Sequence, residues 1–138
     1  MTMDTSRDDL TQAVLEGVAF AIRDSVEAAR SLGIEINTSK ICGGGAKSPL
    51  WKKIMANVLN IELQCLESEQ GPGMGGAMLD MVACGEYESV KAACASTVHV
   101  ASTVRPEPEL AAKYEMCYQQ FKKIYPACKE LFAEFAKE

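Results

Sequence analysis

The chain has 138 residues, of which 48% are hydrophobic and 24% are charged, and its formal net charge is −5 at pH 7. This length predicts one domain over residues 1–138 with a modest core, and the composition is that of an ordinary globular protein. The acidic balance argues against nucleic acid as a partner, because phosphate binding needs clustered Lys and Arg. The sequence shows no signal peptide and no stretch of membrane-spanning length. We therefore expect a cytoplasmic protein without a membrane partner.

The cysteines do not form a metal motif. No two of them are separated by only two residues, as zinc and redox motifs require, and His99 is the single histidine. We expect no metal site and interpret the cysteines as reduced thiols, several of which lie in the core. They are Cys42, Cys65, Cys84, Cys94, Cys117 and Cys128.

The first predicted element is a helix over residues 7–32. Thr5 or Ser6 can cap it, with Asp8 or Asp9 three residues later, and Gly33 is a plausible stop. A mid-helix glycine costs stability relative to Ala, so we expect Gly17 to allow close packing against a neighbour. The apolar side of the helix is predicted from residues at helical spacing: Leu10, Val14, Val18, Ala21, Ile22, Ser25, Ala28, Ala29 and Leu32.

The next segments predict a parallel βαβ unit. Residues 40–42 read as a short strand, residues 48–59 as a helix ending near Asn60, and residues 61–66 alternate as a strand with one polar face does. Two strands joined by a helix pair in parallel through a right-handed crossover. The fold class that we expect is therefore α/β and helix-rich, with two strands that leave a sheet edge unprotected.

A second glycine group spans residues 71–76 and matches G-x-G-x-x-G at Gly71, Gly73 and Gly76. A dinucleotide-binding fingerprint must follow its strand directly, whereas here residues 67–70 intervene and two of them are acidic. We interpret the group as the start of a helix that ends at Gly85, with glycines that allow close packing.

The C-terminal part is predicted to be mainly helical. A short helix is expected over residues 88–95, then a linker-like extended stretch over 99–108 that closes on prolines. The last helix should run over residues 108–135, with an aromatic stripe in the core and a kink or a division at Pro126.

The most informative segment is the glycine run at residues 43–45, which leads from the first strand through Ser48 and Pro49 into a helix. Ser48 suits the N-cap and Pro49 the first helical position. Uncovered N–H groups before a helix N-terminus favour phosphate. A P-loop does not fit, because its two glycines would fall at Ile41 and Ala46. A tight turn without a ligand stays an alternative.

The string Gly-Gly-Gly-Ala-Lys-Ser-Pro-Leu-Trp, residues 43–51, resembles the C-terminal domain of the FGGY carbohydrate kinases, and the xylulokinases most of all. The resemblance extends to residues 13–25, to Gly75–Leu79, to Gly85–Tyr87 and to the C-terminal aromatic segment. It implies part of an actin-like, ribonuclease H-like ATPase domain that binds ATP, with Mg in a complete kinase. It also implies that Gly44 and Gly45 lie against the ATP phosphates and Ser48 near the adenosine. We expect Gly44 to have positive φ. The cofactor-binding residues that follow are Gly43, Gly44, Gly45, Ala46, Lys47 and Ser48.

Two departures from the family pattern are visible. Family members often carry Asp where this chain has Asn57, which puts any role of that carboxylate in question. The catalytic Asp of the family and most of its sugar contacts belong to an earlier part of a complete kinase, and nothing in these residues replaces them. We therefore assign no catalytic residue here, and pentulose would be bound only through that other part.

The resemblance leads to one expected function and two alternatives. The chain is expected to be the ATP-binding, C-terminal fragment of a xylulokinase-like enzyme that converts ATP and D-xylulose to ADP and D-xylulose 5-phosphate. It would be inactive alone and prone to self-association. The alternatives are a stand-alone, non-catalytic module of the same fold that binds a nucleotide or a protein, and a structural fragment without a ligand.

Overall fold

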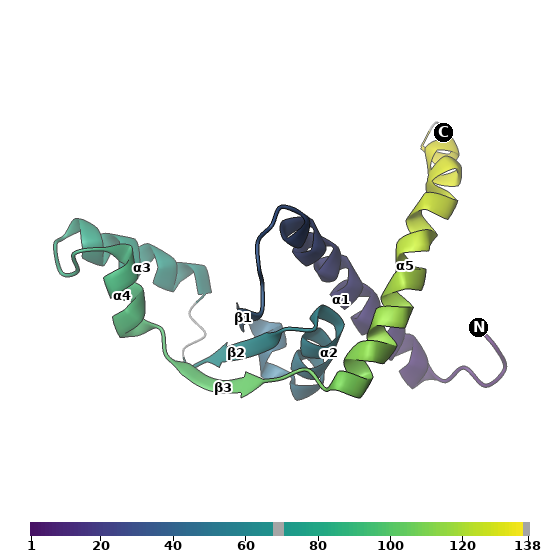
Figure 1. Ribbon diagram of the computed structural model, residues 1–138, viewed down its shortest axis with the longest axis horizontal. Coiled ribbons are helices and arrows are strands. Elements are labelled where there is room, and N and C mark those ends of the chain that lie inside the picture. The colour runs from purple at the N-terminus through teal and green to yellow at the C-terminus, as the bar shows by residue number, and fades with distance from the viewer. Residues whose placement is uncertain (68–70, 137–138) are drawn as a thin grey trace.

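The computed structural model describes residues 1–67 and 71–136, which form a helix-rich α/β fold (Figure 1). The N-terminal half of the chain contains α1 (Arg7–Ser31), β1 (Thr38–Ile41), the 3-10 helix η1 (Gly44–Lys47), α2 (Pro49–Leu59) and β2 (Glu62–Leu66). The C-terminal half contains α3 (Gly71–Ala83), α4 (Val90–Thr97), β3 (Val100–Val104) and α5 (Pro108–Phe135). None of the described helices combines the length and the hydropathy that crossing a bilayer requires.

The sheet has three strands in the order β1-β2-β3. β1 and β2 are parallel, with Ile41 opposite Cys65, so the predicted βαβ unit is confirmed. β3 is antiparallel to β2, with Leu63 opposite Val104 and an irregularity between Cys65 and Leu66. The sequence predicted a linker over residues 99–108 and a sheet of only two strands. Both expectations were wrong, because β3 lies in this segment. The prolines that suggested a linker follow the strand, and a run of mostly β-branched residues precedes them.

The main core lies between the sheet and three helices, α1, α2 and α5, which Figure 1 shows together at one end of the sheet. The helix α2 is its centre, because six consecutive residues from Ile54 to Leu59 are buried there. The buried members of this core are Ala19, Phe20, Ile54, Met55, Ala56, Val58, Leu59, Ile61, Leu63 and Tyr118. α3 and α4 pack on each other away from this core, beyond the other end of β2 and β3 (Figure 1).

The helix α1 begins with the predicted capping box, in which Ser6 and Asp9 exchange side-chain to backbone hydrogen bonds. Its core face was predicted wrongly. The buried residues are Ala19, Phe20 and Arg23, whereas Val14 is 67% exposed. The apolar periodicity did not identify the buried face because that face contains a charged residue, Arg23. Its guanidinium contacts Glu27 and Glu115 and lies over the Tyr118 ring.

The helix α5 matches its predicted bounds and runs unbroken past Pro126, so the predicted division is wrong, while the kink stays a prediction. Only its first half joins the core: Tyr118 is buried and its ring centroid lies 6.0 Å from that of Phe20. In the second half, Phe132 is 53% exposed and Phe135 is 67% exposed. The aromatic stripe is therefore core only as far as Phe121, whose ring centroid lies 5.3 Å from that of Phe20.

The cysteines in the described part of the chain are free thiols, in agreement with the absence of a pairing motif. Cys65 on β2 is buried, whereas Cys42, Cys84 and Cys117 are exposed. The expectation that several thiols lie in the core is therefore wrong, since one of the described cysteines is buried.

Candidate functional site

The glycine loop lies where it was predicted, between the carboxyl end of β1 and the N-terminus of α2. The first glycine makes the turn: Gly43 has φ 87° and ψ −178°, a conformation that is essentially restricted to glycine. The positive φ expected at Gly44 is therefore found one residue earlier, and Gly44 is the first residue of η1. The bend of the chain falls at Gly43, between the end of β1 at Ile41 and the start of η1.

The remaining loop residues are held by short-range hydrogen bonds. The Ala46 N–H donates to the Gly43 carbonyl at 3.0 Å, and the Ser48 N–H donates to the Gly45 carbonyl at 3.1 Å. The N–H groups of Gly44 and Gly45 stand at the start of η1, where a helix offers no acceptor of its own. The loop thus presents backbone donors at the carboxyl end of a parallel strand.

The N-terminus of α2 follows at once. Ser48 caps it, with its Oγ accepting from the Trp51 N–H at 3.3 Å, and Pro49 occupies the first turn as predicted. Lys47 places a cation immediately before this cap. A helix N-terminus, a cation and glycine N–H groups together make a region suited to the phosphates of a nucleotide.

The three glycines differ in what surrounds them. A Cβ on Gly45 would lie 3.0 Å from Cδ1 and Nε1 of Trp51, so a larger residue here would have to displace the indole. A Cβ on Gly44 would meet nothing within 4 Å among the described atoms. Gly44 therefore has no packing reason to be a glycine among the described residues.

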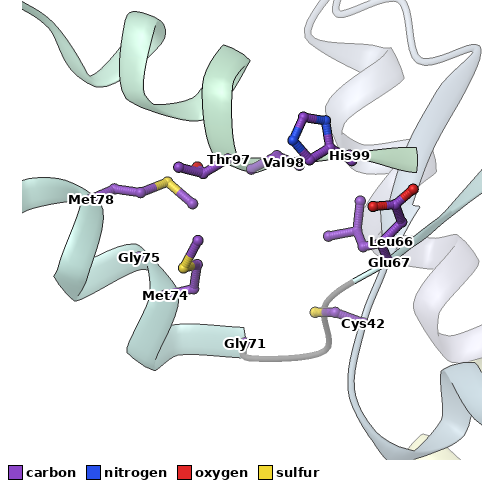
Figure 2. A pocket seen from close by; sticks show the side chains of 10 residues that line it. All are labelled: Cys42, Leu66, Glu67, Gly71, Met74, Gly75, Met78, Thr97, Val98 and His99. Atoms are coloured by element: carbon purple, nitrogen blue, oxygen red, sulfur yellow. The ribbon is translucent and has the colours of Figure 1, made fainter. Parts of the chain in front are cut away.

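A pocket of about 250 Å³ lies beside the loop, at the carboxyl ends of the two parallel strands (Figure 2). Cys42 and Leu66 border it at the ends of β1 and β2, Met74 and Met78 from α3, and His99 from the position before β3. Ligands of open α/β sheets bind outside the carboxyl ends of the strands, and apolar linings with few polar groups are typical of such sites. The remaining lining residues are Glu67, Gly71, Gly75, Thr97 and Val98.

The glycines of α3 border open space. A Cβ on Gly73, Gly75 or Gly76 would meet no described atom within 4 Å, so the predicted close packing is wrong, and so is the same prediction for Gly17. The predicted helix itself is confirmed.

The sequence did not single out the pocket residues. Met74 and Met78 have the helical spacing that places both side chains on the same face. This pattern was interpreted only as part of an apolar helix. His99 was placed in a linker, and its position beside Glu67 follows from the antiparallel β3: the Glu67 N–H donates to the His99 carbonyl at 3.0 Å.

The site contains no arrangement for a metal ion among residues 1–67 and 71–136, where no cluster of three His, Cys, Asp or Glu side chains is found. The loop donors fit the phosphates of ATP, whereas Mg²⁺ prefers carboxylate oxygens and water. No step that involves Mg²⁺ is therefore assigned to these residues.

Asn57, the departure from the family pattern, lies outside the loop and is 1% exposed. Its Oδ1 accepts from the Glu107 N–H at 2.6 Å, and its Nδ2 donates to the Lys53 carbonyl at 2.8 Å. Glu107 is the N-cap of α5 and has no side-chain cap of its own. Asn57 therefore serves as a structural link between α2 and the start of α5.

A family model agrees with this architecture. The model described as the C-terminal domain of the FGGY family of carbohydrate kinases matches residues 1–84, which include α1, the loop, α2 and β2. This chain belongs to the FGGY family of carbohydrate kinases. The crystal structure of a "xyloylose kinase" from Brucella ovis is similar at 36% identity with a TM-score of 0.85, over 95% of this chain and 27% of that chain. The predicted fold class, an actin-like ATPase domain, is confirmed.

Two curated relatives show how far the similarity reaches. The chain is 32% identical to the xylulose kinase of Bacillus subtilis over 91% of its own length and 25% of that protein. It is 35% identical to the ribulokinase of Anoxybacillus flavithermus over 90% of its length and 23% of that protein. The chain thus spans about a quarter of the relatives it matches, and identity alone does not select one sugar.

Proposed function

We propose that this chain is the nucleotide-binding, C-terminal part of a xylulokinase-like kinase. In the complete enzyme, ATP and D-xylulose would give ADP and D-xylulose 5-phosphate. The observation that carries the proposal is the loop at residues 43–48 in a chain of the FGGY family. The loop brings the N–H groups of Gly44 and Gly45, the side chain of Lys47 and the N-terminus of α2 into one short segment.

The contribution of this chain would be positioning and charge stabilisation. Phosphoryl transfer depends on fixing the phosphates in line and on stabilising the charge that develops on them. The N–H groups of Gly44 and Gly45 would donate to phosphate oxygens, and Ser48 would lie toward the adenosine. The base that accepts the proton of the sugar hydroxyl would come from another part of the enzyme.

The neighbouring pocket and the environment of Gly44 favour this proposal over a structural fragment. A loop that serves only as a turn needs Gly43 for its φ and Gly45 for Trp51, but it does not need Gly44. The alternative is a stand-alone module of the same fold that binds a nucleotide or a protein without catalysis. The kinase part and the stand-alone module would both bind their ligand through the loop. Either would be a cytoplasmic protein with no nucleic-acid partner.

The proposal can be tested by titrating the ¹⁵N-labelled 138-residue chain with ATP or ADP and following its amide resonances. One wall of the nucleotide cleft would be absent, so we expect weak, millimolar binding. The shifts should be confined to residues 43–48 and the first turn of α2. Xylulose without nucleotide is the control and should shift nothing. Shifts confined to residues outside the loop would contradict the proposal. So would the absence of any shift at a nucleotide concentration ten times higher than a weak dissociation constant of about 1 mM.

A further inference from the structure

The second half of α5 carries an apolar face that is symmetric about Cys128. Helix positions three, four and seven residues from a given residue share its face, and all six such positions around Cys128 hold large apolar side chains. Five of the six are exposed, by 53% at Phe132 to 67% at Phe135. The residues of this symmetric face are Phe121, Ile124, Tyr125, Cys128, Leu131, Phe132 and Phe135.

The rest of the described chain leaves most of this face uncovered. In Figure 1 the end of α5, in yellow, projects beyond the sheet and the other helices. Phe121 packs against the main core through Phe20, but the later residues of the face are not part of that core. The rings of Tyr125 and Phe132 pack against each other instead, with centroids 6.3 Å apart. A contiguous apolar surface of this kind marks a site of association.

The symmetry of the face makes it complementary to a second copy of itself. Under a two-fold axis that passes beside Cys128, an antiparallel partner places each residue level with the one equally far from Cys128 in the other direction. Phe121 then lies level with Phe135 of the second copy, and Ile124 with its Phe132. Every position on the contact side is apolar on both helices. The rows of residues three and four apart are the ridges by which helices pack.

A hollow beside the symmetric face offers a place for an aromatic ring of the second copy. Its volume is about 440 Å³, and Phe121 and Tyr125 are among the residues that line it. Phe135 of an antiparallel partner would come level with Phe121 and could enter this hollow. Aromatic side chains that fill such pockets are typical anchors of protein interfaces. The other lining residues are Asp24, Lys122, Ile124, Pro126 and Phe132.

The small residue at the centre allows the two helices to approach closely. Packed helices lie about 8–10 Å apart, and their Cα atoms lie about 2.3 Å from the helix axis. Two facing Cα atoms are therefore roughly 3.5–5.5 Å apart, which overlaps the range of roughly 4.4–6.8 Å that a disulfide bridges. Cys128 is a free thiol of intermediate exposure, so it reports directly on such a pairing.

The charges on this half of α5 favour the antiparallel arrangement. Lys122 and Lys123 stand before Cys128, whereas Glu130 and Glu134 stand after it. An antiparallel partner places opposite charges at the same height along the pair, and a parallel partner would place like charges there. Antiparallel helices also oppose their macrodipoles.

We propose that the symmetric face of α5 binds a second copy of the chain as an antiparallel, two-fold helix pair centred on Cys128. The contact covers residues 121–135, a length of about 22 Å. It is smaller than the roughly 800 Å² per partner of a stable interface, so the dimer is weak and depends on concentration. The inference uses no residue of the glycine loop and does not depend on the proposed function.

Oxidative cross-linking of the 138-residue chain at micromolar concentrations tests the pairing. Diamide oxidises two thiols to one disulfide and takes up their two hydrogens, and non-reducing electrophoresis with peptide mass mapping identifies the linked residues. We expect mainly Cys128–Cys128 dimers, although Cys42, Cys84 and Cys117 are more exposed. Cys128→Ser should reduce the dimer at least tenfold. Cys117→Ser, on the same helix, is the matched control and should leave it within twofold.

The direction of pairing is tested with two engineered chains in which Cys128 and the three exposed cysteines are replaced by Ser. One carries Ile124→Cys and the other Phe132→Cys. When the two are mixed and oxidised, an antiparallel pair should yield the mixed dimer in at least fivefold excess over either homodimer. Homodimers in excess would show a parallel pair and overturn the proposal.

A third comparison separates the contact from the folding of the chain. Leu131→Glu should reduce the Cys128 dimer at least tenfold, whereas Met116→Glu, at a position on α5 that is 66% exposed, should leave it within twofold. Neither substitution should lower the urea midpoint, because Leu131 is also 56% exposed. Dimers linked mainly through the other thiols, or equal yields for both variants, would overturn the proposal. A yield that the remaining part of a kinase suppresses without any dimer in its absence would do the same.

Discussion

Gly45 and Trp51 lie so close that a methyl group on the glycine would stand 3.0 Å from Cδ1 and Nε1 of the indole. The glycine loop therefore packs against the first turn of α2 through Gly45 and Trp51, in addition to the hydrogen bond of the Ser48 cap. This contact divides the three glycines by role. Gly43 makes the turn, Gly45 lies against the indole, and Gly44 borders open space.

The first prediction uses that division. Gly44→Val should remove the weak nucleotide binding of the chain while leaving its free energy of unfolding within about 1 kcal/mol, because the side chain enters open space. Gly43→Ala is the matched comparison and should destabilise the chain by about 1–3 kcal/mol through its φ. Urea unfolding and the amide titration measure the two effects. Nucleotide affinity that survives Gly44→Val would show that the glycine has no ligand role.

The second prediction concerns Asn57. Asn57→Leu should destabilise the chain by about 1–3 kcal/mol, because the Glu107 N–H and the Lys53 carbonyl both lose a buried partner. Asn37→Leu, at an exposed position before β1, is the control and should change stability little. If both variants unfold at the same urea concentration as the parent, the link between α2 and α5 contributes nothing.

The third prediction is a loss of stability at alkaline pH. Burial and the hydrogen bond to Glu16 raise the pKa of Tyr114 from 10.0 to about 12, and burial with the hydrogen bond to Asp24 also raises that of Tyr118. The folded chain therefore keeps protons that the unfolded chain releases. This stabilisation is fully present below pH 10 and is lost as the pH rises toward about 12.

Replacement of Tyr114 or Tyr118 by Phe should make the free energy of unfolding less dependent on pH between 10 and 12. Tyr114→Phe and Tyr118→Phe are compared with Tyr125→Phe, whose side chain is in an exposed position. Urea unfolding followed by circular dichroism at several pH values gives the slopes. Identical slopes for all three variants would mean that the hydroxyls of Tyr114 and Tyr118 do not control the alkaline transition.

The fourth prediction is that the 138-residue chain alone does not phosphorylate a pentulose. Phosphoryl transfer needs groups from both sides of the cleft, and no catalytic residue is assigned here. A coupled assay of ADP release with D-xylulose should give no rate above that without sugar. A sugar-dependent rate would require a base within these residues and would refute the assignment.

The fifth prediction is self-association of the chain, most simply as a two-fold dimer. The second half of α5 is the expected contact, because Tyr125, Leu131 and Phe132 are 63%, 56% and 53% exposed. Light scattering at micromolar concentrations should show a mass above that of the monomer, and Phe132→Glu should reduce it. A monomeric mass throughout, without binding of a hydrophobic dye, would establish a self-sufficient monomer.

Much of the fold was predictable because local signals agreed with the final packing. Ser48, Pro49 and the left-handed Asn60 mark the ends of α2, and Ser6 with Asp9 marks the start of α1. The strand β3 was missed because its partner β2 is distant in sequence and the prolines after it suggested a linker. The core side of α1 was missed for another reason, since Arg23 is buried by partners on α5 that periodicity does not record.

The candidate site was only half predictable. The loop follows from its glycines, its cap and its family resemblance. The pocket depends on segments that meet through tertiary structure: the ends of β1 and β2, one side of α3, and the connection from α4 to β3. Even within the loop, the sequence assigned the positive φ to Gly44, because three adjacent glycines do not reveal which one makes the turn.

The hydrogen bond from the Glu67 N–H to the His99 carbonyl joins the two points at which the chain leaves and re-enters the sheet. The helices α3 and α4 lie between these points, and none of their described residues belongs to the main core. They can therefore open as a local unit while β2 and β3 stay paired, which is how cooperative units of a native protein exchange separately. In a hydrogen-exchange experiment, the amides of α3 would exchange through partial opening, and those of α2 only through global unfolding.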